Sequence, residues 1–143
     1  MGFLWHEKYC IGVAEIDKQH KTLLEMLNKA DEAYASEDRN TIVGDESKMR
    51  VYMDILRLRE YAFTHFSTEE RYMIKHQYPR FFDHKQFHDI FIQELFRLEH
   101  RLFNEHNVTP KDLVEFILNW YRVHVTRIDR EFGIYMVNRN AGL

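Results

Sequence analysis

The sequence predicts an all-α protein, an antiparallel up-down four-helix bundle preceded by an extended N-terminal segment. Apolar residues recur at steps of three and four along most of the chain, which is the period of a helix with one buried face. Helix breakers are few, with 5 glycines and 2 prolines among 143 residues. Amphipathic helices joined by connections of modest length favour a bundle, and this length suits a single domain over residues 1–143.

The first two helices are expected at about residues 18–36 and 46–76. Asp17 is a good N-cap for the first helix, because its carboxylate can accept from the free N–H groups of the first turn. Tyr78-Pro79 ends the second helix, since a proline disfavours helical backbone in the residue before it. The residues expected on the buried faces are Leu23, Leu24, Leu27, Ala30 and Tyr34 in the first helix and Ile55, Leu58 and Ala62 in the second.

The last two helices are expected at about residues 81–102 and 110–130. Thr109-Pro110 supplies an N-cap followed by a proline at the first helical position, which is a common start for a helix. The expected buried residues are Phe91, Leu95, Leu98 and Leu102 in the third helix and Leu113, Ile117, Trp120 and Ile128 in the fourth.

Charge and hydropathy favour a cytoplasmic protein without nucleic-acid or membrane partners. The formal charge is −3, and lysine and arginine are interspersed with aspartate and glutamate, so there is no basic stripe to meet phosphates. No apolar run approaches the roughly 18–20 residues that span a bilayer, and the N-terminus does not resemble a signal peptide. The single cysteine, Cys10, suits a reducing compartment. We expect a monomer, because the four helices can bury their apolar faces against one another.

Each predicted helix also carries ionisable side chains on its buried face. Residues four apart on a helix lie one above the other, so a pair of them can share a metal ion. The residues in these positions are His20 in the first helix, His65 and Glu69 in the second, His84 and His88 in the third, and His124 and Asp129 in the fourth. The remaining histidines, which are His6, His76, His100 and His106, are expected at the surface or in loops.

Any one of these residues has an ordinary explanation. A single histidine on an apolar face is usually a hydrogen-bonded core residue, and the His-x-x-x-x-Asp spacing also occurs at His84 and Asp89. The whole set does not, because burying seven ionisable groups costs several kcal/mol apiece unless they are paired or metal-bound. Two carboxylates cannot neutralise five histidines. A metal cluster satisfies all of them.

The ligand types favour iron, with manganese or zinc as poorer fits to mixed imidazoles and carboxylates. Seven ligands are too many for one ion and suit two. Five imidazole nitrogens, two bridging carboxylates and a bridging oxo or hydroxo group fill all but one of the positions around two six-coordinate ions. The remaining position would bind one small molecule.

With these residues the chain resembles the hemerythrin family, and most closely its bacterial single-domain members, the bacteriohemerythrins. The similarity runs from WHEKYCIGVAEIDKQH through HFSTEERYM and HKQFH to WYRVHVTRID. The family pattern pairs one histidine on the first helix with His-x-x-x-Glu, His-x-x-x-His and His-x-x-x-x-Asp on the next three. The seven residues named above fill every place in it.

The resemblance implies two iron ions joined by an oxo or hydroxo bridge. One iron would be held by His84, His88 and His124, the other by His20 and His65, with Glu69 and Asp129 bridging the pair. The five-residue step from His124 to Asp129 turns a regular helix by about 500°, which is not a whole number of turns. We therefore expect a π-type turn between them.

Reversible O₂ binding at the two-histidine iron is the function that the resemblance implies, for carriage, storage or sensing rather than enzymatic turnover. Azide and nitric oxide are other small ligands for such a site. The expected wall of the O₂ pocket is Leu24, Phe66, Trp120, Tyr121 and Val125. Relatives commonly carry an aliphatic residue at the place of Tyr121, so its phenol is expected to alter the lifetime of the oxygenated form.

Three other functions remain open at this stage. The first is a di-iron redox enzyme, such as a peroxidase, an oxidase or a nitric-oxide scavenger. Ferritin-like di-iron enzymes use Glu-x-x-His on two helices, and this chain contains no such spacing, which lowers that hypothesis. The second is a sensory domain of a larger signalling protein, and the third is iron buffering.

Overall fold

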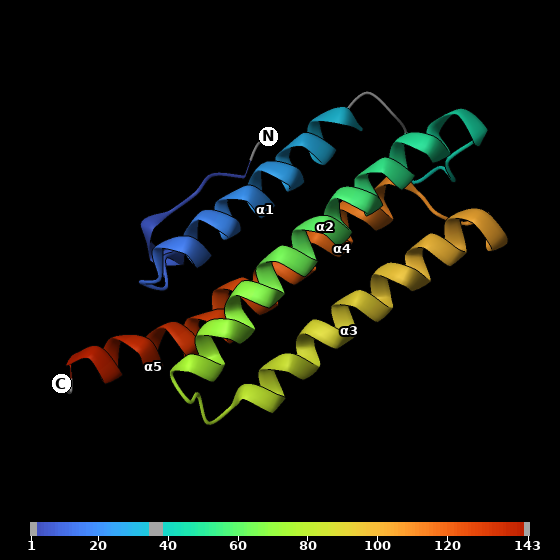
Figure 1. Cartoon of the computed structure of the whole chain (residues 1–143). Coiled ribbons are helices and arrows are strands. Elements are labelled where there is room, and N and C mark those ends of the chain that lie inside the picture. The colour runs from blue at the N-terminus through green and yellow to red at the C-terminus, as the bar shows by residue number, and fades with distance from the viewer. Residues whose placement is uncertain (1–2, 35–38, 142–143) are drawn as a thin grey trace.

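The computed structural model describes residues 3–34 and 39–141, and the chain in these ranges is a bundle of long helices (Figure 1). Helix α1 spans Ala14–Ala33, α2 spans Asp45–Lys75 and α3 spans Phe81–His100. The fourth helix is continuous through α4 (Pro110–Trp120), a π-helical segment η3 (Tyr121–Ile128) and α5 (Asp129–Ala141). Successive long helices run in opposite directions, so the predicted up-down antiparallel bundle is confirmed.

Two short elements complete the described chain. A single 3₁₀ turn, η1 (Glu7–Tyr9), lies in the otherwise extended N-terminal segment, and a π-helical turn, η2 (Arg101–Glu105), prolongs α3. His106 then takes a left-handed backbone with a φ of 52°, which ends the helix. None of the helices in residues 3–34 and 39–141 is long and apolar enough to cross a membrane.

The first helix begins at Ala14, before the predicted start at residue 18, because Asp17 is not its N-cap. The residue at the N-cap is Val13, and the Asp17 carboxylate instead accepts from the backbone N–H groups of Ile11 at 2.7 Å and Gly12 at 3.3 Å. It therefore fixes the loop that leads into the helix. The predicted end at Ser36 falls on residues 35–38, outside the described ranges.

The fourth helix continues to Ala141, beyond the predicted end at residue 130, because its last three turns have apolar surface to bury. Phe132 and Met136 are buried in a second hydrophobic cluster with Ile11, Ile16, Met73 and Tyr78. Arg139 donates to the carbonyl oxygen of His76 at 2.8 Å, which places a cation at the C-terminus of α2.

Gly133 allows the N-terminal segment to lie directly on α5. A Cβ atom at this position would lie 2.6 Å from both the Cβ and the carbonyl oxygen of Ile11. Such a separation is well inside van der Waals contact, so only glycine fits while the backbones keep this spacing.

The main core fills the bundle with the predicted apolar faces. Leu23, Leu27, Ile55, Leu95 and Leu113 are among its fully buried members. Trp120 and Ile128, predicted as buried, are half-buried at the two ends of the π-helical segment. The start of that helix follows the sequence prediction closely, because the Thr109 hydroxyl accepts from the Asp112 N–H and the Asp112 carboxylate accepts from the Thr109 N–H.

Candidate metal centre

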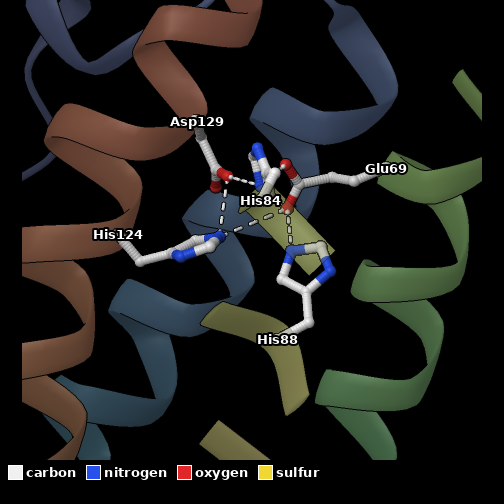
Figure 2. Close-up of side chains that lie close together, drawn as sticks. All are labelled: Glu69, His84, His88, His124 and Asp129. Atoms are coloured by element: carbon white, nitrogen blue, oxygen red, sulfur yellow. Dashed lines mark ion pairs between the residues drawn. The ribbon is translucent and has the colours of Figure 1, made fainter. Parts of the chain in front are cut away.

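All seven residues predicted as metal ligands lie together inside the bundle. His20 comes from α1, His65 and Glu69 from α2, His84 and His88 from α3, His124 from η3, and Asp129 is the first residue of α5. None is more than 2% exposed. Figure 2 shows the side chains of five of them pointing toward one another: Glu69, His84, His88, His124 and Asp129.

The π-helical segment is what brings Asp129 to the centre. The N–H of Asp129 donates to the carbonyl oxygen of His124, a hydrogen bond that spans five residues. In this geometry two side chains five apart lie on the same face, which a regular α-helix does not allow. The predicted π-type turn between His124 and Asp129 is confirmed.

The ligand atoms form two groups, and in each the atoms lie within 4.8 Å of one another. Both groups contain Glu69 and Asp129. One group adds three histidines and the other adds two, and the members are Glu69, His84, His88, His124 and Asp129 in the first and His20, His65, Glu69 and Asp129 in the second. The described residues thus offer two cation positions that share a pair of carboxylates.

Asp129 faces the two groups with different oxygens. Its Oδ2 lies 2.6 Å from His20 Nε2 and 3.5 Å from His65 Nε2. Its Oδ1 lies 2.8 Å from His124 Nε2 and 3.0 Å from His84 Nε2. Asp129 thus directs one carboxylate oxygen at each group of histidines.

Glu69 spans the same two groups from the opposite helix. Its Oε1 lies 2.5 Å from His65 Nε2 in the smaller group and 3.6 Å from His88 Nε2 in the larger one. Its Oε2 lies 3.2 Å from His84 Nε2. Both oxygens therefore face imidazole nitrogens that converge on the same small volume.

Most of these converging atoms lack a hydrogen bond, although buried polar groups normally make one. Among the described residues no hydrogen-bond partner is found for the atoms Glu69 Oε1 and Oε2, Asp129 Oδ1, and Nε2 of His65, His84, His88 and His124. Their contacts of a few ångströms lack hydrogen-bond geometry. Buried nitrogen and carboxylate oxygen atoms that meet without bonding to each other fit a bound cation, and this donor set suits iron.

The buried carboxylates and imidazoles of the centre change one another's pKa values. Burial alone would lower the pKa of His65 and of His84, but the carboxylates of Glu69 and Asp129 outweigh it and raise these pKa values to about 9 and about 10. Burial would raise the pKa of Asp129, yet the facing imidazoles hold it far below its usual range. His124 is the exception, because burial prevails there and lowers its pKa to about 4. The metal-free centre thus holds anionic carboxylates against protonated imidazoles, and a bound cation would take the place of those protons.

Aromatic rings cover the centre. Phe66 stacks on His88 with the ring centroids 4.0 Å apart, and Trp120 stacks on His124 at 3.9 Å. These two residues of the predicted O₂ pocket therefore lie against the three-histidine group. Phe66 is also near the two-histidine group, with its ring centroid 5.9 Å from that of His65. The other predicted pocket residues, Leu24, Tyr121 and Val125, are buried.

Tyr61 is a neighbour of the centre that the sequence analysis missed. Its ring stacks on His65 with the centroids 5.3 Å apart. Burial raises its pKa well above the usual value, and the charges of Asp129 and Glu69 and the nearby Tyr121 add to that rise. The hydroxyl groups of Tyr61 and Tyr121 are buried and have no hydrogen-bond partner among the described residues. Tyr61 lies four residues before His65 on a helix, a spacing that could have indicated the contact.

The remaining histidines lie outside the centre. His6, His100 and His106 are exposed and His76 is half-buried at the end of α2, which agrees with their predicted surface or loop positions.

A helical bundle with a buried histidine and carboxylate centre defines a class of cation-binding proteins. Residues 11–133 match the family model described as the hemerythrin HHE cation binding domain. The chain is 32% identical over 133 residues to a bacteriohemerythrin of Clostridium acetobutylicum, covering 91% of this chain and 98% of that one. It is 28% identical to a bacteriohemerythrin of Methylococcus capsulatus (85% and 86% covered) and 24% identical to a hemerythrin-like protein of Naegleria gruberi (91% and 90% covered). The protein belongs to the hemerythrin family.

Proposed function

We propose that the protein binds O₂ reversibly at a non-haem di-iron centre. The observation that carries the proposal is the pair of ligand groups that share Glu69 and Asp129 but differ in their number of histidines. His84, His88 and His124 would hold one iron and His20 and His65 the other. With the two carboxylates and an oxo or hydroxo bridge in common, the first iron would have six ligands and the second five.

When bound, the two ferrous ions would supply the two electrons that O₂ takes up and returns. The open position would fall on the side of His20 and His65, since that group has one imidazole fewer. Buried apolar side chains exclude water from the surroundings, which slows the loss of a reduced oxygen species as a protonated product. Phe66 and Trp120 cover the three-histidine side of the centre by stacking on His88 and His124, and the Phe66 ring also lies beside His65 in the two-histidine group.

A second candidate function, a di-iron redox enzyme that consumes O₂, is favoured by the two buried tyrosines. A reduced oxygen species leaves the centre only after it has gained protons, and a phenol is a proton source in a dry site. The hydroxyls of Tyr61 and Tyr121 are buried without a partner among the described residues. We rank this second, because a buried phenol whose pKa is raised gives up its proton reluctantly.

An absorption experiment separates the two candidates. The iron-loaded protein is reduced without air, exposed to O₂, and then purged with inert gas. A charge-transfer band that appears with O₂ and fades on purging supports reversible binding. Direct conversion to a diferric spectrum that purging does not reverse contradicts it and favours the enzyme. Azide added to the diferric form probes the same open position, since it should give a single new charge-transfer band at one equivalent.

A further inference from the structure

The Nδ1 atoms of the five ligand histidines, which point away from the centre, differ in their hydrogen-bond partners. Among the described residues, Nδ1 of His20, His84 and His124 is buried without a hydrogen-bond partner. His65 Nδ1 lies 2.7 Å from Oε1 of Gln19, and His88 Nδ1 lies 3.0 Å from Oε2 of Glu70. Each cation position therefore has one histidine with an outer acceptor. The acceptor is a neutral amide for the two-histidine group and a carboxylate for the three-histidine group.

The orientation of the Gln19 amide is fixed by a chain of hydrogen bonds. The Thr68 hydroxyl donates to the Thr64 carbonyl at 2.8 Å, so its oxygen is left to accept. The Gln19 amide nitrogen donates to that oxygen at 2.9 Å. The amide oxygen must then face His65, and since it can only accept, the proton must sit on His65 Nδ1. In the neutral imidazole that a metal ion needs, this leaves the lone pair of Nε2 directed at the centre.

Glu70 acts on His88 with a full charge. A hydrogen bond to a carboxylate is about twice as strong as one to a neutral acceptor. It draws the Nδ1 proton away from the ring and makes the opposite nitrogen a stronger donor to a metal. Glu70 is partly buried, with a side chain that is 25% exposed, so water weakens this effect without removing it.

We propose that Gln19 and Glu70 are positioning residues that give the two cation positions unequal ligand strength. Glu70 strengthens His88 and so tightens the three-histidine position. Gln19 holds the His65 ring in place without adding charge, which leaves the two-histidine position the weaker-binding one and the one able to exchange a ligand. The inference rests on the two-cation part of the proposed function, but not on O₂ binding.

Cobalt(II) binding to the metal-free protein tests this directly. Co²⁺ accepts imidazole and carboxylate ligands, and its uptake is followed by calorimetry and by its visible absorption, with no activity needed. Glu70→Gln should weaken the tighter binding step by about 10- to 100-fold, the usual loss when an outer partner of a ligand histidine is removed. Gln19→Glu should tighten the weaker step, and Gln19→Leu should weaken that same step without any change in charge.

Glu115→Gln is the matched control, since it removes one negative charge from an exposed residue of α4 that pairs with Lys111 and lies outside the metal centre. Thermal unfolding followed by circular dichroism checks that each variant is folded, and the Gln19 variants test the inference if Glu70→Gln is not. Equal effects of Glu70→Gln on both steps, or an effect no larger than that of Glu115→Gln, would overturn the proposal. If the wild-type protein binds only one Co²⁺, the di-iron function fails, and a change in that single step on Glu70→Gln still supports the role of Glu70.

Discussion

His20 is one of only two histidines in the smaller ligand group, and its Nε2 lies 2.6 Å from Asp129 Oδ2. Its replacement by alanine would leave one imidazole and two shared carboxylates at that position. We therefore expect His20→Ala to retain one tightly held iron and to lose or loosely hold the second. Metal content after dialysis, measured by inductively coupled plasma spectrometry, checks this. Two tightly bound irons with unchanged O₂ binding would overturn the assignment of His20.

Tyr121 is expected to influence how long the oxygenated form survives. Its hydroxyl is buried, and its neighbour Tyr9 contacts it edge-on with the ring centroids 5.6 Å apart. If the phenol donates a proton or a hydrogen bond at the centre, Tyr121→Phe should slow autoxidation by about fivefold, which corresponds to about 1 kcal/mol for one hydrogen bond. The decay of the oxygenated spectrum gives the rate. Equal rates in the wild type, Tyr121→Phe and Tyr121→Leu would exclude any role of the hydroxyl.

At the scale of residues, convergence of the seven ligand side chains could be predicted from the sequence, and their outer contacts could not. Helical spacing decides which face a side chain occupies, so His65 and Glu69 had to lie together. The contact of Gln19 with His65 joins two helices and depends on how each is rotated about its axis. Glu70 next to Glu69 likewise looks like an ordinary surface residue until its distance to His88 is known.

Among the elements, the N-terminal segment and α5 depend most closely on each other, and Gly133 is where they meet. Helix propensity alone would make Gly133→Ala stabilising by about 1 kcal/mol. The added Cβ would lie 2.6 Å from the carbonyl oxygen of Ile11, so backbone has to move, and overpacking of this kind costs about 1–3 kcal/mol. We expect a net loss in the free energy of unfolding, measured by urea denaturation.

Gly44→Ala is the control for this prediction, because nothing lies within 4 Å of a Cβ at that position and its φ of −80° suits alanine. Gly44 is the N-cap of α2, where glycine is preferred to alanine, so a loss of up to about 1 kcal/mol is expected from the cap alone. A Gly133→Ala protein as stable as Gly44→Ala would show that the N-terminal segment does not rest on α5 in solution.

At the scale of elements, the sequence predicted one irregular feature of the helices but not where the helices end. The π-helical segment followed from the five-residue spacing of His124 and Asp129, because no regular helix could present both. The true ends of the helices did not follow. The Asp17 carboxylate can accept hydrogen bonds either from the first turn of its own helix or from the loop before it. Only the path of that loop decides between the two. The contact between Gly133 and Ile11 likewise depends on the path of the N-terminal segment, which no spacing along the chain predicts.

In the whole molecule, the bundle encloses seven ionisable side chains. Without metal, their charges can be neutralised only by ion pairs between the carboxylates and the imidazoles. Among the described residues, both carboxylate oxygens of Glu69 and several imidazole nitrogens around them are buried without a hydrogen bond, so a cation gains most there. A cation that binds the folded state alone stabilises it by an amount that grows with concentration, about 2.7 kcal/mol at a hundredfold excess over Kd. For a chain of this size that amounts to a rise in Tm of roughly 5–11 °C. Removing the metal with a chelator should lower Tm by as much.

Thermal unfolding at several metal concentrations tests this prediction, and the choice of ion sharpens it. Co²⁺ or Fe²⁺ kept without air should raise Tm progressively, because imidazole nitrogens bind these ions well. Mg²⁺ prefers six oxygen ligands and should have little effect at the same concentration. His20→Ala should retain the part of the rise that comes from the three-histidine group and lose the rest. If Tm does not change with Co²⁺, or rises equally with Mg²⁺, the buried centre is a network of ion pairs and not a metal-binding site.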